Sequence, residues 1–433
     1  MSETTIKAIY GRQVWDSRGR PTVEAEVHLT SGLFGRAIAP VGASVGSAEA
    51  VDLRDGGSRM EGYGVERAVC HINTEIAGCL RGFEATDQIS IDQALVALDG
   101  TANKSRLGAN AMIAVSMAAA HAAAAGVREP LFRYLGGSTA TILPMPEIQI
   151  FGGGIHARRR VDIQDFMMVP VSAQSFSEAL RIASEVYHSA EKLMEKLGKL
   201  RGVADEGGFW PEFDTNEEAL ESLVRAIEAA GYIPGKDVAL SLDIAASQFY
   251  DSGRYRLGVE AKEYDSDGLG ELLVGWLDRF PILAIEDPMA EEDTEGFRRL
   301  TASVGHRVHV VGDDLLVTNA ARIEAACESS LCNAALIKPN QAGTLTETKA
   351  AFDAGIRAGW LVITSARSGE TEDVTIVHLG VGWGAGFLKV GSFARSERMA
   401  KWNEALRIET ALGSAGHLAG IKAPVLQGNP NRG

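Results

Sequence analysis

The sequence predicts an α/β protein in which an α+β N-terminal region caps a closed βα barrel. The barrel prediction rests on short apolar runs in the second part of the chain, each ending in a polar or charged residue and each followed by a helical pattern. They recur about every 25 to 40 residues, the length of one βα unit. The six runs cover 238–243, 282–287, 308–314, 334–340, 360–365 and 386–390. Six units, with more strands upstream, favour a barrel over an open sheet and place functional side chains at the carboxyl ends of the strands.

The α+β prediction rests on the first part of the chain. Residues 22–29 alternate as T-V-E-A-E-V-H-L, which is typical of a half-buried strand, and Ser31-Gly32 separates them from a second expected strand over 33–39. The helical patterns that follow cover 64–80, 89–98 and 109–125. Because Gly-Gly-Ser-Thr interrupts the chain at Gly136, we expect an N-terminal capping domain over 1–137 and a barrel domain over 138–433.

Length, composition and charge limit the possible functions. The chain has 433 residues, 45% of them hydrophobic, which is enough for two domains with large cores. Its 42 basic and 57 acidic residues give a formal charge of -15, which argues against a nucleic-acid partner and suits a divalent cation bound by carboxylates. The four cysteines form neither a C-x-x-C pair nor a disulfide pattern, so a cytoplasmic location is expected.

Neither a targeting segment nor a membrane span is expected. The N-terminal residues 1–12 alternate polar and apolar side chains and have no apolar core of the kind found in a signal peptide. The most apolar window, 109–126, is mostly alanine and is interrupted by Asn110, Ser116 and His121. Since a span needs about 20 strongly apolar residues, this window falls short in length and hydropathy and is predicted to be an interior helix.

The expected strand ends carry charged side chains with a common chemistry. In chain order they are Asp243, Glu286, Asp313, Lys338, Arg367 and Lys389. Three carboxylates on consecutive strands would meet at the barrel mouth and offer the oxygen ligands that Mg²⁺ prefers. The metal would neutralise a substrate carboxylate, while a desolvated lysine would remove the proton from the adjacent carbon. Each residue alone could be a solvated strand-end charge, but six in succession indicate a site.

Ordered motifs make the sequence similar to the enolase family over nearly the whole chain. They include Asp16-Ser17-Arg18-Gly19, Gly42-Ala43-Ser44, Asn103-Lys104-Ser105, Asp205-Glu206-Gly207-Gly208, Ile285-Glu286-Asp287-Pro288, Gly312-Asp313-Asp314-Leu315 and Arg367-Ser368-Gly369-Glu370-Thr371-Glu372-Asp373. The resemblance implies an enolase-type βα barrel with an α+β capping domain, Mg²⁺ as the cofactor, and assembly as a homodimer or a dimer-based octamer.

The resemblance also implies roles for single residues. The implied metal ligands are Asp243, Glu286 and Asp313 for one Mg²⁺ and Ser44 for a second. The implied catalytic residues are Lys338 as the base, Glu206 and Asp165 near the departing hydroxyl, Lys389, and the loop residue His156. The implied substrate-binding residues are Arg367 and Ser368 for the phosphate, Lys389 for the carboxylate, Gln164 and His156. A guanidinium fork is well shaped for the phosphate.

Two departures from the family pattern lie among the implied catalytic residues. Ala366 replaces the histidine of the S-H-R-S motif, which removes a proton donor. Asp165 replaces the glutamate of Q-E-F-M, and its carboxylate is set back by about one methylene, enough to disturb general acid catalysis. On this interpretation the dehydration of 2-phosphoglycerate is expected to be weak or absent.

A third departure is the run Arg158-Arg159-Arg160, which follows His156-Ala157 in a loop that by resemblance closes over the active site. A run of charges is most often a solvated surface. In a chain that is otherwise strongly acidic, three arginines beside a phosphate site favour instead a substrate with more negative charge than 2-phosphoglycerate.

Three functions remain open after these observations. The preferred hypothesis is an altered enolase homologue that takes a second anionic substrate, resembling carboxyphosphonoenolpyruvate synthase of phosphonate and phosphinate antibiotic pathways, with a nucleotide-activated phosphonoformate as co-substrate. The alternative is an ordinary enolase that dehydrates 2-phosphoglycerate to phosphoenolpyruvate. The third is a non-catalytic binding protein, which the retained metal ligands disfavour. In each case the expected partners are small anions, with no nucleic acid and no membrane.

Overall fold

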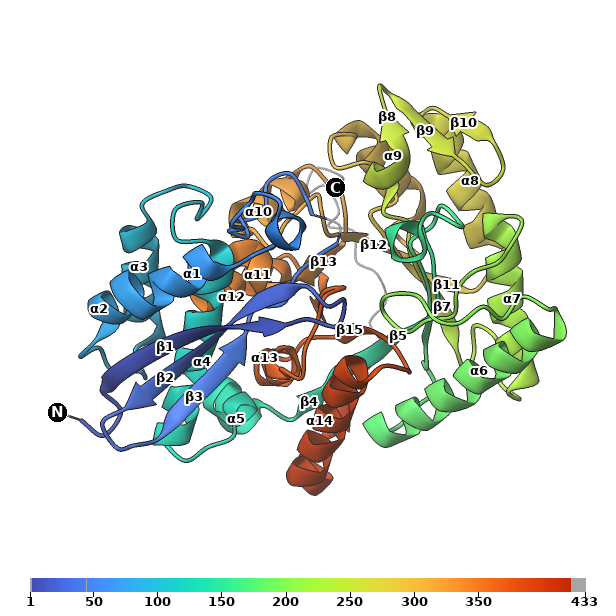
Figure 1. Cartoon of the computed structure of the whole chain (residues 1–433). Helices are drawn as coiled ribbons and strands as arrows, with labels where there is room; N and C mark the ends of the chain where they lie inside the picture. Colours follow the sequence, from blue (N-terminus) through green and yellow to red (C-terminus); the bar gives the residue numbers. More distant parts are fainter. Residues whose placement is uncertain (1, 44, 422–433) are drawn as a thin grey trace, which may run out of the picture.

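The two parts of the chain lie side by side in the structure, a computed structural model that describes residues 2–43 and 45–421 (Figure 1). The N-terminal part contains a small sheet and the helices that surround it. Its strands are β1 (Ile6–Trp15), β2 (Pro21–Leu29) and β3 (Phe34–Ile38). Its helices are α1 (Glu66–His71), α2 (Ala77–Leu80), α3 (Gln88–Asp99), α4 (Ala109–Gly126) and α5 (Leu131–Gly136), and a π-helical turn over Ile72–Ile76 joins α1 to α2.

The antiparallel sheet β1–β2–β3 confirms the expected hairpin and adds one strand to it. The alternating run 22–29 is β2, and Val23, Ala25 and Val27 on it are fully buried. Strand β1 pairs with β2 along its whole length. The N-terminal residues of the chain also alternate between polar and apolar side chains. This alternation was a usable signal for β1.

Helix α4 packs across this sheet and forms the core of the N-terminal part. By length and composition α4 is apolar enough to cross a membrane, so the prediction that it falls short in length and hydropathy was wrong. The prediction of an interior helix is confirmed, because 83% of α4 is buried inside the protein. Its alanines allow an unusually close approach to β3: a Cβ on Gly35 would lie 2.1 Å from the backbone nitrogen of Ala122 and 2.4 Å from the carbonyl oxygen of Ala118.

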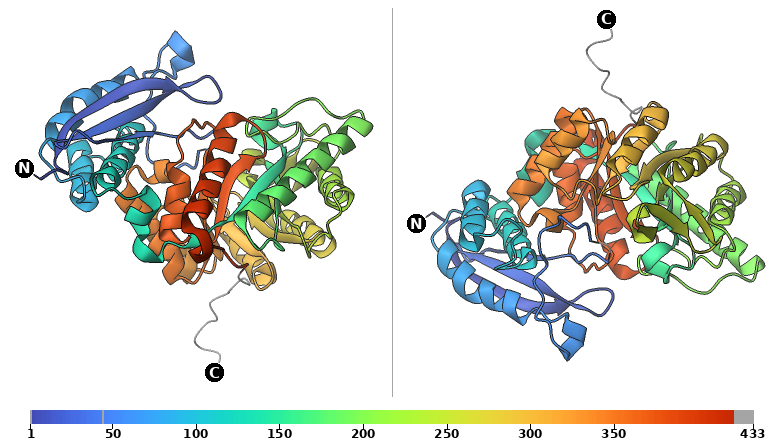
Figure 2. Two further views of the ribbon diagram at one scale, coloured as in Figure 1. Left: turned by 90° about the horizontal axis from the view of Figure 1, so that it is seen from below. Right: turned by 90° about the horizontal axis from the view of Figure 1, so that it is seen from above.

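The rest of the chain is a βα barrel with helices around it (Figure 2). The barrel strands are β5 (Met145–Gly152), β6 (Asp165–Val169), β7 (Ala239–Asp243), β11 (Ile282–Glu286), β12 (His309–Gly312), β13 (Ala334–Ile337), β14 (Leu361–Ser365) and β15 (Phe387–Ser392). The helices are α6 (Phe176–Lys196), α7 (Asn216–Ala229), α8 (Ser266–Arg279), α9 (Thr294–Val304), α10 (Ala320–Glu328), α11 (Pro339–Ala342), α12 (Leu345–Arg357), α13 (Thr375–Trp383) and α14 (Ser396–Leu412). The short strands β8 (Tyr250–Asp251), β9 (Arg254–Leu257) and β10 (Lys262–Tyr264) form a separate sheet, and β4 (Ile142–Leu143) pairs with β16 (His417–Leu418).

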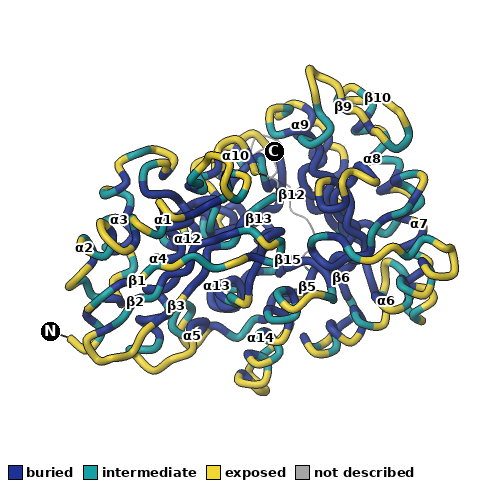
Figure 3. Tube along the Cα trace, viewed as in Figure 1, coloured by how far each residue is buried: buried dark blue, intermediate teal, exposed yellow. Residues whose placement is uncertain are grey.

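Within the described residues the barrel is closed, in the order β11–β12–β13–β14–β15–β5–β6–β7. The six predicted runs are β7 and β11 to β15, so the predicted fold class is confirmed. One strand departs from a uniform βα repeat, because β6 runs antiparallel to both β5 and β7. The amino end of β6 therefore lies at the same barrel mouth as the carboxyl ends of its neighbours. Burial is deepest along these strands and α4 (Figure 3).

Hydrogen bonds hold the N-terminal part against the barrel. Asp92 on α3 accepts hydrogen bonds from the backbone nitrogen and the hydroxyl of Thr346 at 2.8 and 2.6 Å. Val41 and Gly369 donate backbone hydrogen bonds to each other's carbonyl oxygens at 2.9 and 2.8 Å. The second pair places the loop after β3 over the barrel mouth, where it can contribute to a site.

Replacing Gly35 with alanine is expected to destabilise the protein by about 1–3 kcal/mol or more, because the new methyl group would overlap the backbone of α4. Urea unfolding followed by circular dichroism measures the loss. The matched control is Gly275→Ala on α8, where a Cβ meets nothing within 4 Å and helix propensity predicts a gain of about 0.5–1 kcal/mol. Equal unfolding midpoints for the two variants would contradict the close packing of β3 on α4.

Candidate active site

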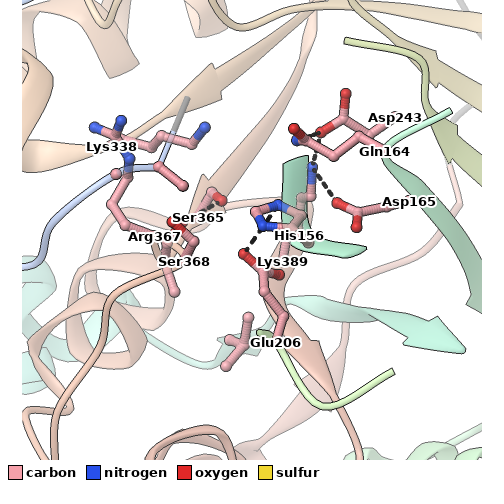
Figure 4. Close-up of a pocket in the computed structure, with 14 residues that line it drawn as sticks. His156, Gln164, Asp165, Glu206, Asp243, Lys338, Ser365, Arg367, Ser368 and Lys389 are labelled. Carbon is pink, nitrogen blue, oxygen red and sulfur yellow. Dashed lines mark hydrogen bonds and ion pairs between the residues drawn. The ribbon is translucent and has the colours of Figure 1, made fainter. Parts of the chain in front are cut away.

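The barrel mouth holds a small cavity lined by polar side chains (Figure 4). Its volume of about 20 Å³ is roughly the space of one water molecule. The predicted site residues that line it are His156, Gln164, Asp165, Glu206, Asp243, Lys338, Arg367, Ser368 and Lys389. Lys338 and Arg367 lie to one side, Gln164 and Asp165 to the other (Figure 4). Substrate entry therefore requires side chains in the mouth to move apart.

Lys389, in the middle of β15, neutralises carboxylates of nearby barrel strands. Its Nζ lies 2.8 Å from Asp243 Oδ2, 2.7 Å from Glu286 Oε2 and 3.7 Å from Asp165 Oδ2. Burial lowers the pKa of Lys389, but these carboxylates outweigh burial and raise it well above its ordinary value. Burial, together with repulsion from Asp243, raises the pKa of Glu286 well above its usual range.

Lys338 forms a second buried ion pair, with Asp313 on the adjacent loop. Burial lowers the pKa of Lys338, but the charge of Asp313 outweighs it, and the pKa is raised. The pKa of Asp313 is lowered for the converse reason: burial raises it, and the ammonium of Lys338 more than compensates. In this arrangement Lys338 is protonated and cannot serve as a base.

The three predicted metal ligands remain a prediction, because among the described residues the group that includes Asp313 and offers ligand atoms within 4.8 Å of one another is Asp287, Asp313 and Asp314. Asp243, Glu286 and Asp313 are buried at the same mouth, and such carboxylates need positive charge nearby. Two lysine ammoniums supply it here, and Glu286 Oε1 has no hydrogen-bond partner within residues 2–43 and 45–421. Hard oxygen ligands of this kind suit Mg²⁺. The fourth predicted ligand, Ser44, lies outside the described residues.

His156, Asp165 and Glu206 form an acidic cluster on the far side of the cavity, with one ligand atom from each within 4.8 Å of the others. Burial and repulsion from Glu206 raise the pKa of Asp165 to about 6. Burial also raises the pKa of Glu206, but Arg398 and His156 outweigh it and the pKa is lowered. Neighbouring carboxyl groups with separated pKa values suit one proton donor and one ionised partner.

Strand β5 orients this cluster through a residue that the sequence analysis missed. The Gln149 amide donates to the carboxylate of Asp165, and its carbonyl oxygen accepts the backbone N–H of Gly208 at 2.8 Å. Gln164 donates to Asp243 Oδ2 at 2.8 Å, which joins the cluster to the carboxylates around Lys389. A glutamine inside the apolar run 145–152 was a usable signal, since a buried amide needs partners.

The predicted phosphate-binding pair, Arg367 and Ser368, is held by residues from the N-terminal part. Arg367 Nη1 donates to Glu49 Oε2 at 3.0 Å and to Asn340 Oδ1 at 2.9 Å. Arg18 Nη1 donates to Ser368 Oγ at 3.3 Å. Arg18 and Glu49 were not predicted as site residues. Arg18 does lie in one of the motifs that carried the resemblance, whereas no spacing along the chain pointed to Glu49.

The arginines Arg158, Arg159 and Arg160 do not line the cavity at the mouth. They line a separate surface cavity of about 450 Å³ beside Trp210 and Phe213. All three are exposed, and Arg160 lies 3.6 Å from Glu212.

The loop that carries these arginines turns sharply, because Arg158 and Arg159 both adopt positive φ angles of 51° and 58°.

Ala366, in contrast to the arginines, lines the cavity at the mouth and donates its backbone N–H to the Lys389 carbonyl oxygen at 2.9 Å. Of the three departures from the family pattern, Ala366 and Asp165 therefore line the cavity at the mouth, and the arginine run does not.

If Asp243 is a metal ligand as predicted, Asp243→Ala is expected to abolish activity and to weaken the thermal stabilisation that Mg²⁺ provides, because the variant removes that ligand and one partner of Lys389. Differential scanning fluorimetry across a Mg²⁺ titration measures this. Asp251→Ala, which removes an exposed carboxylate on β8, is the control and should respond to Mg²⁺ like the wild type. A variant at position 243 that keeps the full Mg²⁺ response would remove Asp243 from the metal site.

Two family models match nearly the whole chain. The model of the enolase N-terminal domain matches residues 6–135, and that of the enolase C-terminal TIM barrel domain matches residues 140–426. A curated relative, Enolase 1 of Desulfitobacterium hafniense (strain Y51), is 50% identical over 413 residues, which cover 95% of this chain and 94% of the relative. Together with the buried carboxylates and lysines of the barrel mouth, these matches show that the chain belongs to the enolase family of Mg²⁺-dependent lyases.

Proposed function

We propose that this enzyme dehydrates 2-phosphoglycerate to phosphoenolpyruvate, the alternative rather than the preferred hypothesis of the sequence analysis. One observation carries the proposal: a candidate base, Lys338, and a candidate acid cluster around Asp165 face the same buried cavity from opposite sides. Removal of a proton on one side and of a hydroxyl on the other is the chemistry of dehydration. The half-identity to Enolase 1 along 95% of the chain supports the same function.

The first step is proton removal from the carbon that carries the phosphate. Lys338 would accept this proton as the base in a state in which it no longer pairs with Asp313, and Asp313 would then be one of the residues that hold Mg²⁺. Bound Mg²⁺ would stabilise the negative charge on the substrate carboxylate. Lys389 would then hold the carboxylate, while Arg367 and Ser368 hold the phosphate.

The second step is loss of the β-hydroxyl, which needs a proton. Asp165 lies in the acidic cluster and has a raised pKa, so it can donate this proton while Glu206 stays ionised. His156 lies 3.8 Å from Glu206, and its Nδ1 has no hydrogen-bond partner among the described residues, which leaves it available to the substrate. Although its side chain is shorter than that of glutamate, Asp165 lines the cavity. We therefore propose that 2-phosphoglycerate is dehydrated at an ordinary rate, in place of the weak dehydration expected from the sequence.

A second candidate function follows from the arginine cavity. Arg158, Arg159 and Arg160 surround a hollow beside Trp210, and this combination of positive charge and an aromatic face suits a nucleotide-activated anion. Such a co-substrate would make the enzyme a synthase similar to carboxyphosphonoenolpyruvate synthase, a transferase, with Ala366 leaving room at the active site. The separation of this cavity from the catalytic residues makes it the second choice.

We further propose the domain division, the location, the assembly and the partners of the enzyme. The division into residues 1–137 and 138–433 is inferred from the Gly-Gly-Ser-Thr interruption at Gly136, and a location in the cytoplasm from the cysteine pattern. Assembly as a homodimer or dimer-based octamer is inferred from the resemblance to the family. Small phosphate-containing anions are the proposed substrates, and the formal charge of -15 disfavours nucleic acid and anionic membranes as partners.

The wild-type enzyme is expected to form phosphoenolpyruvate from 2-phosphoglycerate, and Lys338→Ala is expected to slow exchange of the α-proton with solvent deuterium by about 10²- to 10⁴-fold. Exchange followed by NMR isolates the first step from dehydration. Lys349→Ala, which breaks an exposed ion pair with Asp353 on α12, is the matched control and should exchange normally. Wild-type exchange in the Lys338 variant would assign the base to another residue, and absence of turnover in the wild type would reject the dehydratase.

The second candidate is tested by replacing Arg158, Arg159 and Arg160 with serine. If the cavity binds a polyanion, calorimetric titration with a cytidylyl-activated phosphonoformate should show a loss of affinity of several orders of magnitude, at about 1.5–3 kcal/mol for each charge-assisted contact. Binding of 2-phosphoglycerate should change little. No binding of the activated anion to the wild type, or equal losses for both ligands, would leave the arginines as ordinary surface charges.

A further inference from the structure

The side chain of Gln341 lies where three parts of the active site meet. It belongs to α11, three residues after Lys338, and is almost fully buried. Its Nε2 donates to Asp313 Oδ1 at 2.9 Å and to Glu49 Oε1 at 3.2 Å. Its carbonyl oxygen accepts the hydroxyl proton of Thr318 at 2.6 Å. A single amide thus satisfies two carboxylates and one hydroxyl, and these partners fix which way the amide is turned.

Thr318 connects this amide to the base. Its hydroxyl oxygen accepts the backbone N–H of Lys338 at 2.9 Å while its proton goes to Gln341, so both hydrogen-bonding functions are used. Thr318 and the preceding Val317 both adopt positive φ angles, of 51° and 43°. Such angles are unfavourable for β-branched residues and persist only where the surrounding contacts enforce them. The loop after β12 is therefore held in a strained shape that presents this hydroxyl to Lys338.

On its other side the amide reaches the predicted phosphate-binding arginine. Glu49, which accepts from Gln341, also binds both terminal nitrogens of Arg367, at 3.0 and 3.2 Å. Glu49 and Arg367 are both buried, so their relative position is fixed by these contacts and not by solvent. The resulting chain of hydrogen bonds runs from the backbone of the base, through Thr318 and Gln341, to a metal ligand and to the arginine.

We propose that Gln341 and Thr318 are positioning residues that hold Lys338, Asp313 and Arg367 in a common geometry. The chemistry requires this pair of side chains, because only an amide offers two donors to two carboxylates and an acceptor to a hydroxyl. A glutamate at 341 would set three carboxylates against one another, and a lysine would leave the hydroxyl without an acceptor. The catalytic part of this inference rests on the proposed dehydration; the part that concerns Asp313 does not.

The test compares variants that differ by one hydrogen-bonding group. Thr318→Val keeps the shape and removes the hydroxyl, whereas Thr318→Ser keeps the hydroxyl; Gln341→Met removes the amide at similar volume. Thr348→Val is the matched control, since its buried hydroxyl donates only to the Thr344 carbonyl oxygen within the same helical segment. Mg²⁺ affinity of the metal-free protein is measured by calorimetry, and kcat and KM for 2-phosphoglycerate are measured in parallel.

Loss of a residue that orients metal ligands typically costs 10- to 100-fold in affinity or activity. We expect losses of this size in Mg²⁺ affinity for Gln341→Met, and in kcat for both Gln341→Met and Thr318→Val. The Thr348→Val control should keep the wild-type Mg²⁺ affinity and kcat, and Thr318→Ser should recover the wild-type kcat. Equal losses in the serine and valine variants would overturn the role of the hydroxyl. Unchanged Mg²⁺ affinity in Gln341→Met would overturn the role of the amide, even if the wild type did not dehydrate 2-phosphoglycerate.

Discussion

The compensation of buried negative charge at the barrel mouth is the constraint on which the rest of the active site depends. Asp243 and Glu286 at the ends of β7 and β11, and Asp313 directly after β12, are buried away from water, and an isolated buried carboxylate is costly. Lys338 and Lys389 neutralise them, each at the price of being fixed in an ion pair. The same pairing raises the pKa of Lys338, so the proposed base is held in its protonated form by its partner Asp313.

The antiparallel strand β6 determines which residues face these carboxylates. In a uniform parallel barrel the first residue of a strand would lie at the opposite end from the site. Because β6 is reversed, Asp165 pairs with Asp243 across the ladder and reaches the mouth together with Gln164. Asp165 therefore comes from a strand beginning, whereas His156 and Glu206 come from the segments between strands, and Lys338 and Arg367 follow strand ends.

The sequence allowed the parallel strands and their charged ends to be predicted because each βα unit repeats a local pattern. It did not allow β5 and β6 to be placed, since no α-helix separates these two strands and β6 is reversed, and Asp165 was assigned only through family resemblance. Gln341, Glu49 and Arg18 could not be found by spacing. Glu49 and Gln341 are 292 residues apart along the chain and meet only when the loop after β3 lies over the barrel. Residues that position others are set by such tertiary contacts, which no local pattern records.

The barrel closes where its last strand in chain order, β15, pairs with its first, β5. Lys389 therefore lies beside Glu147, although the two strands stand at nearly opposite ends of the barrel segment. Contacts of such long range require a long loop to close, and this entropic penalty slows folding. Lys389 and Asp165 come within 3.7 Å of each other beside this seam. The predicted site residues on β15 and β6 therefore meet only when the two ends of the barrel segment have paired.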